Sequence, residues 1–183
     1  MRSDGNIMTK FFTAVFILIL AVGFLWMGTA FADKPAAPTD RPAPKEVASD
    51  SNKDGKPDRW EYYENGVLVK AEADTNYDGT VDERAVIKDG KIVKTEKDTN
   101  NDGKTDVWQY FVESKLVRVE IDTNKDGKPD RWEYYEQGVL VRVEADTNFD
   151  GVADEKATVK DGKITKVEKD SDYDGKPDKW VTY

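Results

Sequence analysis

The sequence is organised around a nine-residue acidic pattern that recurs six times. The pattern is D-x-[ND]-x-D-G-x-x-D, and its copies lie 24 residues apart, beginning at Asp50, Asp74, Asp98, Asp122, Asp146 and Asp170. Strict repetition at such a period predicts a repeat architecture in which each unit is one small supersecondary structure. Any fold of this chain must therefore present six similar loops at regular intervals.

The pattern has the chemistry of a calcium-binding loop. Acidic and amide side chains at alternate loop positions supply the oxygen ligands that Ca²⁺ prefers, and a glycine at the sixth position permits the sharp turn around an ion. Asp, Asn and Gly are also common turn residues, so one isolated copy could be only a polar connection. Six copies in register, each with Asp at the ninth position, favour calcium binding. In the fourth copy we expect side-chain oxygens from Asp122, Asn124, Asp126 and Asp130, and the backbone carbonyl of Lys128.

Composition excludes several classes of function. The 183 residues include no cysteine and no histidine, which excludes disulfides, structural zinc sites of the Cys/His type and histidine-based general base catalysis. No hydroxyl nucleophile lies beside an evident activating base, so we expect no enzymatic activity. The net charge of −9 argues against nucleic acid as a partner.

Residues 1–32 have the pattern of an export signal. Arg2 and Lys10 precede an uncharged apolar run, and Ala30-Phe31-Ala32 forms an A-x-A cleavage pattern. We therefore predict a signal peptide cleaved after Ala32 and a secreted or periplasmic protein. The alternative is an uncleaved membrane anchor, because the uncharged stretch is nearly long enough to span a bilayer. A membrane is expected as a partner only in that case.

The remaining chain divides at residue 50. Residues 33–49 contain four prolines and no apolar periodicity, which predicts an extended, disordered spacer. Residues 50–183 contain all six acidic loops and form the predicted repeat domain.

Between the loops the sequence predicts β-hairpins. In the first unit, the β-rich runs Arg59–Glu64 and Val67–Ala73 flank Asn65-Gly66, and Asn-Gly between alternating runs is a strong hairpin signal. The same slot holds Asp89-Gly90, Glu113-Ser114, Gln137-Gly138 and Asp161-Gly162, of which only Glu113-Ser114 lacks glycine.

A two-residue turn also predicts which side chains face one another across the first hairpin. The expected pairs are Tyr63–Leu68, Tyr62–Val69, Glu61–Lys70, Trp60–Ala71 and Arg59–Glu72. One face would then carry Trp60, Tyr62, Val67, Val69 and Ala71, and the other would carry the ion pairs with Tyr63 and Leu68. The second unit fits this register less well, because Glu83 would face Glu96.

The predicted fold class is all-β. Strands joined alternately by tight turns and acidic loops form an elongated antiparallel hairpin meander of about eleven strands, with the tight turns on one edge and the loops on the other. Residues 50–73 match residues 122–145 at 20 of 24 positions, so three hairpins make a 72-residue superrepeat. The pattern is compatible with an open sheet and with a closed solenoid.

The loops resemble known calcium-binding loops. They resemble EF-hand loops in part, but the acid that EF-hands carry at the twelfth position is missing from four copies. Dockerin loops differ because a helix follows each of them. The loops more closely resemble those of thrombospondin type-3 repeats and integrin-type propeller blades, where the pattern joins short extended segments. The intervening Trp-x-Tyr-Tyr-x-Asn-Gly-x-Leu pattern is similar to bacterial MORN-type variant repeats, which are strings of β-hairpins. These resemblances cover residues 50–183, although the thrombospondin cysteines are absent.

The resemblance implies one ligand arrangement for all six loops, and up to six Ca²⁺ ions as cofactors. The first, third, fifth and ninth side chains and the seventh backbone carbonyl would bind the ion. The implied ligands are Asp50, Asn52, Asp54, Lys56 and Asp58; Asp74, Asn76, Asp78, Thr80 and Asp82; Asp98, Asn100, Asp102, Lys104 and Asp106; Asp122, Asn124, Asp126, Lys128 and Asp130; Asp146, Asn148, Asp150, Val152 and Asp154; and Asp170, Asp172, Asp174, Lys176 and Asp178.

Two functions are compatible with these features. The first is an exported, non-enzymatic calcium-binding repeat protein with a structural or surface-interaction role, in which Ca²⁺ rigidifies the hairpin array. The alternative is a module that binds a cell-surface protein or polysaccharide through its aromatic face, with calcium as a scaffold. Four tryptophans follow the ninth-position aspartate by two residues, and we expect them to cover the sheet beside the ion or to stack on sugars: Trp60, Trp108, Trp132 and Trp180.

Overall fold

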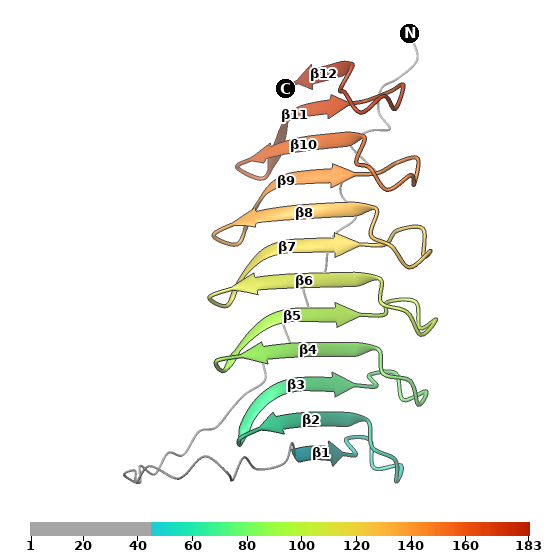
Figure 1. Cartoon of the computed structure of the whole chain (residues 1–183), viewed down its shortest axis with the longest axis vertical. Coiled ribbons are helices and arrows are strands. Elements are labelled where there is room, and N and C mark those ends of the chain that lie inside the picture. Colours follow the sequence, from blue (N-terminus) through green and yellow to red (C-terminus); the bar gives the residue numbers. More distant parts are fainter. Residues whose placement is uncertain (1–44) are drawn as a thin grey trace. The chain divides into compact units, whose positions relative to one another are not determined.

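The computed structural model describes residues 45–183, which form one antiparallel sheet of twelve strands, each paired with its neighbour in sequence (Figure 1). The strands are β1 (Lys45–Ser49), β2 (Arg59–Glu64), β3 (Val67–Ala73), β4 (Glu83–Lys88), β5 (Lys91–Lys97), β6 (Val107–Val112), β7 (Lys115–Ile121), β8 (Arg131–Glu136), β9 (Val139–Ala145), β10 (Glu155–Lys160), β11 (Lys163–Lys169) and β12 (Lys179–Thr182). The all-β hairpin meander predicted from the sequence is confirmed. The predicted signal peptide and most of the predicted spacer lie outside the described residues.

The sheet is open. β1 and β12 are its two outer strands and do not pair with each other, so the strands do not close into a barrel or solenoid over the described residues. The tight turns line one side, called the turn edge, and the six acidic loops line the opposite side, called the loop edge (Figure 1). Within residues 45–183, no helix is long and apolar enough to cross a membrane.

β1 corrects the predicted boundary of the spacer and raises the number of strands from eleven to twelve. Lys45–Ser49 pairs with β2 from Lys45↔Tyr63 to Ser49↔Arg59, and the amide of Asp58 donates to the Ser49 carbonyl at 2.9 Å. The four prolines of the spacer all precede Lys45. Every residue of β1 therefore keeps the N–H that strand pairing requires, although its side chains are exposed.

Each hairpin contains a register shift that the sequence analysis did not predict. In the first hairpin Tyr63↔Leu68 pair as expected, but the register then shifts by one residue and Tyr62 faces Lys70. The predicted pairs Tyr62–Val69, Glu61–Lys70, Trp60–Ala71 and Arg59–Glu72 are therefore wrong. A β-bulge of this kind inserts one unpaired residue, here Val69, and increases the local twist.

The shift removes the charge conflict in the second unit. Arg84 faces Glu96, and Glu83 faces Lys97, with the Lys97 ammonium 2.5 Å from a Glu83 carboxylate oxygen. Without the shift, Glu83 would face Glu96. Opposite charges across neighbouring strands stabilise the sheet and like charges destabilise it, so the bulged register is the favourable one.

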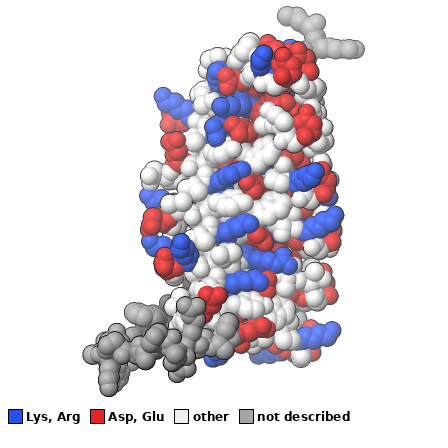
Figure 2. Space-filling model, viewed as in Figure 1, with Lys and Arg blue, Asp and Glu red and all other residues white. Residues whose placement is uncertain are grey.

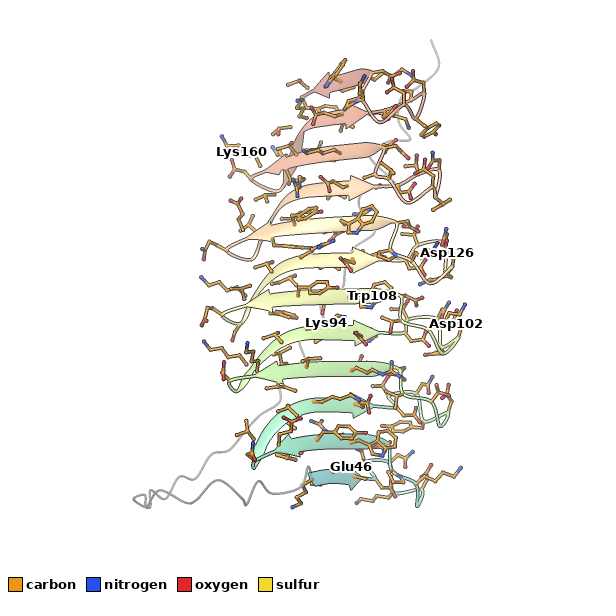
Figure 3. All side chains as sticks on the ribbon, in the orientation of Figure 1. Glu46, Lys94, Asp102, Trp108, Asp126 and Lys160 are labelled. Atoms are coloured by element: carbon orange, nitrogen blue, oxygen red, sulfur yellow. The ribbon has the colours of Figure 1, made fainter. Side chains whose placement is uncertain are left out.

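The bulge also decides which side chains share a face. Trp60 and Tyr62 lie with Lys70 and Glu72 on the face that Figures 1 and 3 turn toward the viewer, called the front face. The prediction that Ala71 shares this face with Trp60 is wrong, because Ala71 pairs with Glu61 on the back face. The back face holds a buried row that crosses β7 to β10 and consists of Val119, Glu133, Val143 and Ala157.

The two-residue turns are confirmed, including the one without glycine. Asn65 and Gly66 have φ angles of 51° and 78°, the left-handed pair that a type I′ turn requires. Glu113 and Ser114 adopt the same conformation, with φ angles of 49° and 62°. The position of the turn therefore follows from the repeat, and glycine eases the conformation without being necessary for it.

Five tyrosine hydroxyls donate hydrogen bonds to glutamates and have raised pKa values, which predicts alkaline unfolding. The hydrogen bond is the main cause for Tyr62 and Tyr63, whereas burial is the main cause for Tyr110, Tyr134 and Tyr135 and the hydrogen bond adds to it. The pairs are Tyr62–Glu72, Tyr63–Glu61, Tyr110–Glu120, Tyr134–Glu144 and Tyr135–Glu133. The Glu72 hydrogen bond raises the pKa of Tyr62 from 10.0 to about 12.

A tyrosine whose pKa is higher in the folded state stabilises the fold at pH values below its unfolded pKa. That stabilisation is lost as the pH rises through its folded pKa. We expect the free energy of unfolding, measured by urea denaturation, to fall as pH rises from 10 to about 12, with tyrosinate absorbance delayed until unfolding. Ordinary tyrosinate titration in the folded protein would contradict these hydrogen bonds.

Candidate metal-binding loops

All six loops adopt the same backbone conformation on the loop edge. The fourth residue of each loop has a φ angle between 60° and 66°, and the sixth, always glycine, has a φ angle between 86° and 96°. Both angles lie in the left-handed region that glycine tolerates best. This local fold curls each loop so that the side chains at the first, third and fifth positions lie close together.

The first-position aspartate anchors each loop. In every copy its Oδ2 accepts a hydrogen bond from the glycine amide at 2.7–2.8 Å. In the fourth loop, Asp122 also accepts the amides of Lys125 at 2.7 Å and Asp126 at 3.3 Å. The carboxylate thus orders the loop backbone. A carboxylate has about four acceptor positions, so its oxygens remain able to contact a cation.

The third and fifth residues are linked to each other. In the first five loops the asparagine Oδ1 accepts the amide of the fifth residue at 2.9–3.1 Å, and the asparagine amide group donates back to that residue's carboxylate at 2.9–3.3 Å. In all six loops the fifth-position carboxylate also accepts the amide of the seventh residue at 2.7–2.9 Å. The first, third and fifth side chains therefore form one hydrogen-bonded group with the loop backbone.

The ninth-position aspartate lies at the base of the loop and is held by a residue that the sequence analysis did not single out. In every copy the amide of the second residue donates to it at 2.7–3.0 Å. In the first five loops the second-residue hydroxyl donates as well, at 2.6–2.8 Å. The signal was available in the sequence, since the second position is always Ser or Thr: Ser51, Thr75, Thr99, Thr123, Thr147 and Ser171.

Successive loops are joined through their aspartates. The amide of Asp74, the first residue of the second loop, donates to the carbonyl of Asp58, the ninth residue of the first loop, at 2.8 Å. The same bond recurs at each of the four following junctions at 2.8–2.9 Å. Nearly all the aspartates in this row are buried, namely Asp58, Asp74, Asp82, Asp98, Asp106, Asp122, Asp130, Asp146, Asp154 and Asp170. The loop edge therefore concentrates buried negative charge along the length of the sheet.

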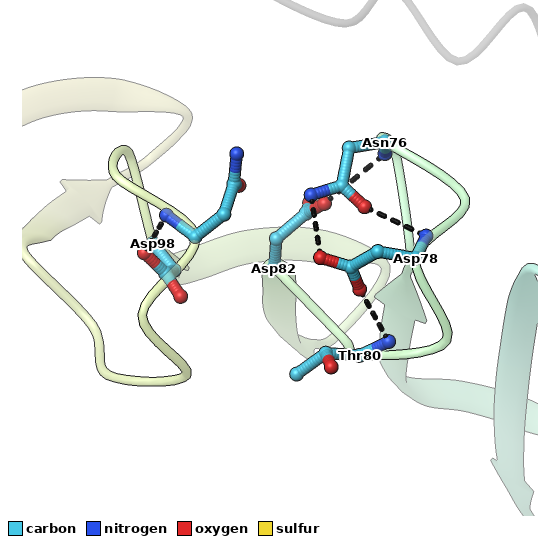
Figure 4. A pocket seen from close by; sticks show the side chains of 6 residues that line it. Asn76, Asp78, Thr80, Asp82 and Asp98 are labelled. Carbon is cyan, nitrogen blue, oxygen red and sulfur yellow. Dashed lines mark hydrogen bonds between the residues drawn. The ribbon is translucent and has the colours of Figure 1, made fainter.

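A shallow pocket marks one of these junctions (Figure 4). Its lining comes from the second and third loops and consists of Asn76, Asp78, Thr80, Asp82, Asp98 and Asn101. Figure 4 shows the carboxylate of Asp78 held by the amide of Thr80 and by the side chain of Asn76. The Thr80 amide and the Asn76 side chain lower the pKa of Asp78, so this carboxylate is charged at neutral pH.

The sixth loop brings three carboxylates together. Asp170, Asp172 and Asp174 each place a carboxylate oxygen within 4.8 Å of the others, and this group does not include Asp178. A hydrogen bond with Asp170, local desolvation by the neighbouring loop atoms and the charge of Asp174 raise the pKa of Asp172, although its side chain is exposed. The sixth loop thus holds more negative charge than the others, which have asparagine at the third position.

Lys125 connects two loops through its ammonium group. Its Nζ lies 2.9 Å from Oδ2 of Asp106 and 3.2 Å from Oγ1 of Thr99, both in the preceding loop. Burial alone would raise the pKa of Asp106, but hydrogen bonds from Lys125 and Thr99 hold it below its usual value. The ammonium therefore places a positive charge at the base of the third loop.

Replacement of Lys125 is expected to have opposite effects with and without calcium. In chelator, Lys125→Met should lower the free energy of unfolding by roughly 1–2 kcal/mol, because Asp106 loses a charged partner. In calcium, the third loop should bind the ion several-fold more tightly, because a competing positive charge is gone. The amide resonance of Gly103, in the third loop, would follow that site during titration. Lys53→Met is the matched control, since no loop precedes the first one, and equal effects of both substitutions would contradict the cross-loop contact.

The comparisons with known proteins leave the family open. No protein-family model matches the chain, and no curated protein matches it. Among solved structures, the chain is similar to "accessory secretory protein 1,2 and 3" of Streptococcus pneumoniae, with 20% sequence identity and a TM-score of 0.41. The match covers 53% of this chain and 18% of that chain, so this chain spans less than a fifth of its structural neighbour.

Proposed function

We propose that the six loops bind Ca²⁺ and that the protein is an exported, non-enzymatic repeat protein whose hairpin array is rigidified by these ions. The observation that carries the proposal is the shared geometry of the loops. In each copy a carboxylate anchored to the glycine amide lies beside oxygen-bearing side chains at the third and fifth positions. Clustered carboxylate and amide oxygens on one curled backbone suit a hard divalent cation.

Electrostatics supports the same proposal. Each loop contributes at least three aspartates, and most of the first and ninth positions are buried. Charges gathered in a partly desolvated row repel one another, and a bound divalent cation removes that repulsion. In the first five loops the fifth-position carboxylate has a hydrogen bond from the uncharged asparagine amide group, which does not neutralise its negative charge. Ion binding would then contribute directly to folding stability.

The test is a calcium titration of the chelator-treated chain, followed by calorimetry for stoichiometry and by Tb³⁺ luminescence for location. Trp60, Trp108, Trp132 and Trp180 lie at the start of strands that leave the loops, so their excitation should sensitise Tb³⁺ emission. Calcium should compete with Tb³⁺ for these sites. Equilibrium dialysis that leaves the protein metal-free at several millimolar Ca²⁺, within the range where extracellular calcium modules are occupied, would refute the proposal.

A matched pair of variants locates the ions in the loops. Asp126→Asn removes a charged oxygen from the fourth loop and should reduce the number of bound ions by one. Asp161→Asn removes the same charge from a tight turn on the opposite edge and should leave the stoichiometry unchanged. Equal losses from both substitutions would mean that calcium is only a diffuse counterion of an acidic protein.

A further inference from the structure

The front face carries a regular alternation of aromatic rings and cations. Across β6 to β9 one row consists of Tyr110, Arg118, Tyr134 and Arg142. Each of these residues faces the next one on the neighbouring strand. The Arg118 guanidinium lies 5.8 Å from the ring centre of Tyr110 and 5.7 Å from that of Tyr134, and the Arg142 guanidinium lies 3.8 Å from Tyr134. Distances below about 6 Å permit attraction between a cation and an aromatic face. The row is therefore ordered by its own contacts.

A second row, closer to the loop edge, consists of tryptophans and glutamates. Trp108 faces Glu120, which in turn faces Trp132, and Trp132 faces Glu144. Figure 3 shows Trp108 and Lys94 on this face, at the middle of the sheet. Two aromatic side chains thus project from each of β6 and β8, and one cation and one glutamate from each of β7 and β9.

The glutamates lie deeper than the cations. The side chain of Arg118 is 41% exposed and that of Glu120 is 14% exposed; for Arg142 and Glu144 the values are 37% and 21%. The same order holds for the equivalent pairs of β3, β5 and β11. Glu120 and Glu144 also accept the hydroxyls of Tyr110 and Tyr134 at 3.0 and 2.9 Å. These carboxylates therefore already accept hydrogen bonds within the face. Figure 2 shows Lys and Arg side chains in a row along the middle of the same face.

The two arginines retain hydrogen-bonding capacity that the protein does not use. Each arginine forms one ion pair with the glutamate two residues further on: Nη2 of Arg118 lies 2.5 Å from Oε1 of Glu120, and Nε of Arg142 lies 3.5 Å from Oε1 of Glu144. A guanidinium has five N–H donors, so one such pair leaves Nη donors on each partly exposed side chain for a further acceptor. Both arginines flank Tyr134, on strands two apart, which separates them by about 10 Å along the sheet.

We propose that the front face binds a linear anionic polysaccharide whose carboxylates pair with Arg118 and Arg142 and whose sugar rings stack on the neighbouring tryptophans and tyrosines. A guanidinium recognises a carboxylate through two parallel hydrogen bonds, which suits uronic acid residues. The pair of one cation and one glutamate recurs on every second strand from β3 to β11, so a polymer with evenly spaced carboxylates can contact several hairpins at once, with a gain in avidity. An acidic peptide is the weaker candidate, because peptides bind sheets mainly by pairing with an edge strand.

The test uses short hyaluronate oligosaccharides, in which every second sugar is a glucuronate, with the full chain in calcium. Calorimetry should show binding that weakens with added salt, and no binding of uncharged chito-oligosaccharides of equal length. Arg118→Gln with Arg142→Gln should weaken binding by about tenfold or more, since two bidentate contacts are lost. The matched control, Lys160→Gln with Lys163→Gln, removes the same charge at the turn edge and should change the affinity less than about twofold.

Folding of the variants is checked separately. Arg118→Lys with Arg142→Lys keeps both charges but lacks the planar guanidinium, so it should fold normally and still lose most of the affinity. Circular dichroism and the midpoint of thermal unfolding would establish that each variant is folded.

Several results would overturn the proposal. They are absence of hyaluronate binding, equal binding of the uncharged oligosaccharides, equal losses in both glutamine variants, and tighter binding of polyglutamate or single-stranded DNA. Binding that survives the arginine substitutions but vanishes in chelator would place the sugar on the loop edge, and would also overturn it. The proposal is independent of the calcium proposal, because metal stoichiometry and front-face binding are measured by different titrations.

Discussion

Saturation with calcium is expected to raise the free energy of unfolding of this protein by about 8 kcal/mol relative to chelator. At ten times its dissociation constant, an ion that binds only the folded state contributes about 1.4 kcal/mol, and six independent sites contribute six times that amount. The total is comparable to the whole stability of an ordinary domain. At roughly 3 °C per kcal/mol for a chain of this size, the midpoint of thermal unfolding should rise by roughly 20 °C.

The physical reason is the row of aspartates along the loop edge. Asp122 and Asp106 are each 1% exposed, and their neighbours in the row are also buried. The back face supplies only a small apolar core, whose buried hydrophobic side chains are Val119, Val143, Ala157 and Val159. A single-layer sheet with so little apolar burial depends on other sources of stability.

The calcium effect is measured by scanning calorimetry and urea denaturation, with NaCl used to match ionic strength. Magnesium is the informative comparison ion, because it requires a smaller and more regular ligand shell than calcium. It should therefore stabilise the protein much less at the same concentration. A midpoint that is the same in chelator and in calcium would contradict both the ion sites and the role of ions in stability.

Asp122→Ala is expected to be the most damaging single substitution in the loops. Asp122 is buried and accepts amides from Lys125, Asp126 and Gly127. Its removal leaves these donors without their acceptor, so the free energy of unfolding in chelator should fall by about 3 kcal/mol. In calcium a further loss of about 1.4 kcal/mol should appear, because the fourth loop no longer holds an ion.

Asp126→Ala is expected to separate the structural role of the loop from its proposed role in ion binding. Asp126 is exposed at the loop tip and accepts only the amide of Lys128 at 2.9 Å and the side chain of Asn124 at 3.3 Å. Water can replace both contacts, so the loss in chelator should stay below about 1 kcal/mol. The calcium-dependent loss should match that of Asp122→Ala. Equal losses in chelator for the two substitutions would show that Asp122 is not the anchor of the loop.

Much of the site could be predicted from local sequence because the loops are locally determined. The glycine at the sixth position, the aspartate at the first and the Ser or Thr at the second interact within nine residues, so their hydrogen bonds follow from spacing alone. The contact of Lys125 with Asp106 could not be predicted in this way. It depends on how closely the sheet brings two consecutive loops together, and position four is lysine in only two of the six copies.

The sequence by itself determined the repeat, the hairpins, the position of the tight turns, and the placement of all loops on one edge. These features follow from turn residues at fixed spacing, which act over a few residues. Only the tertiary structure decided the bulge at Val69, the composition of the front face, the addition of β1 and the open ends of the sheet. Each of these depends on pairing with a neighbouring strand and on sheet twist, and one hairpin's sequence is compatible with either register.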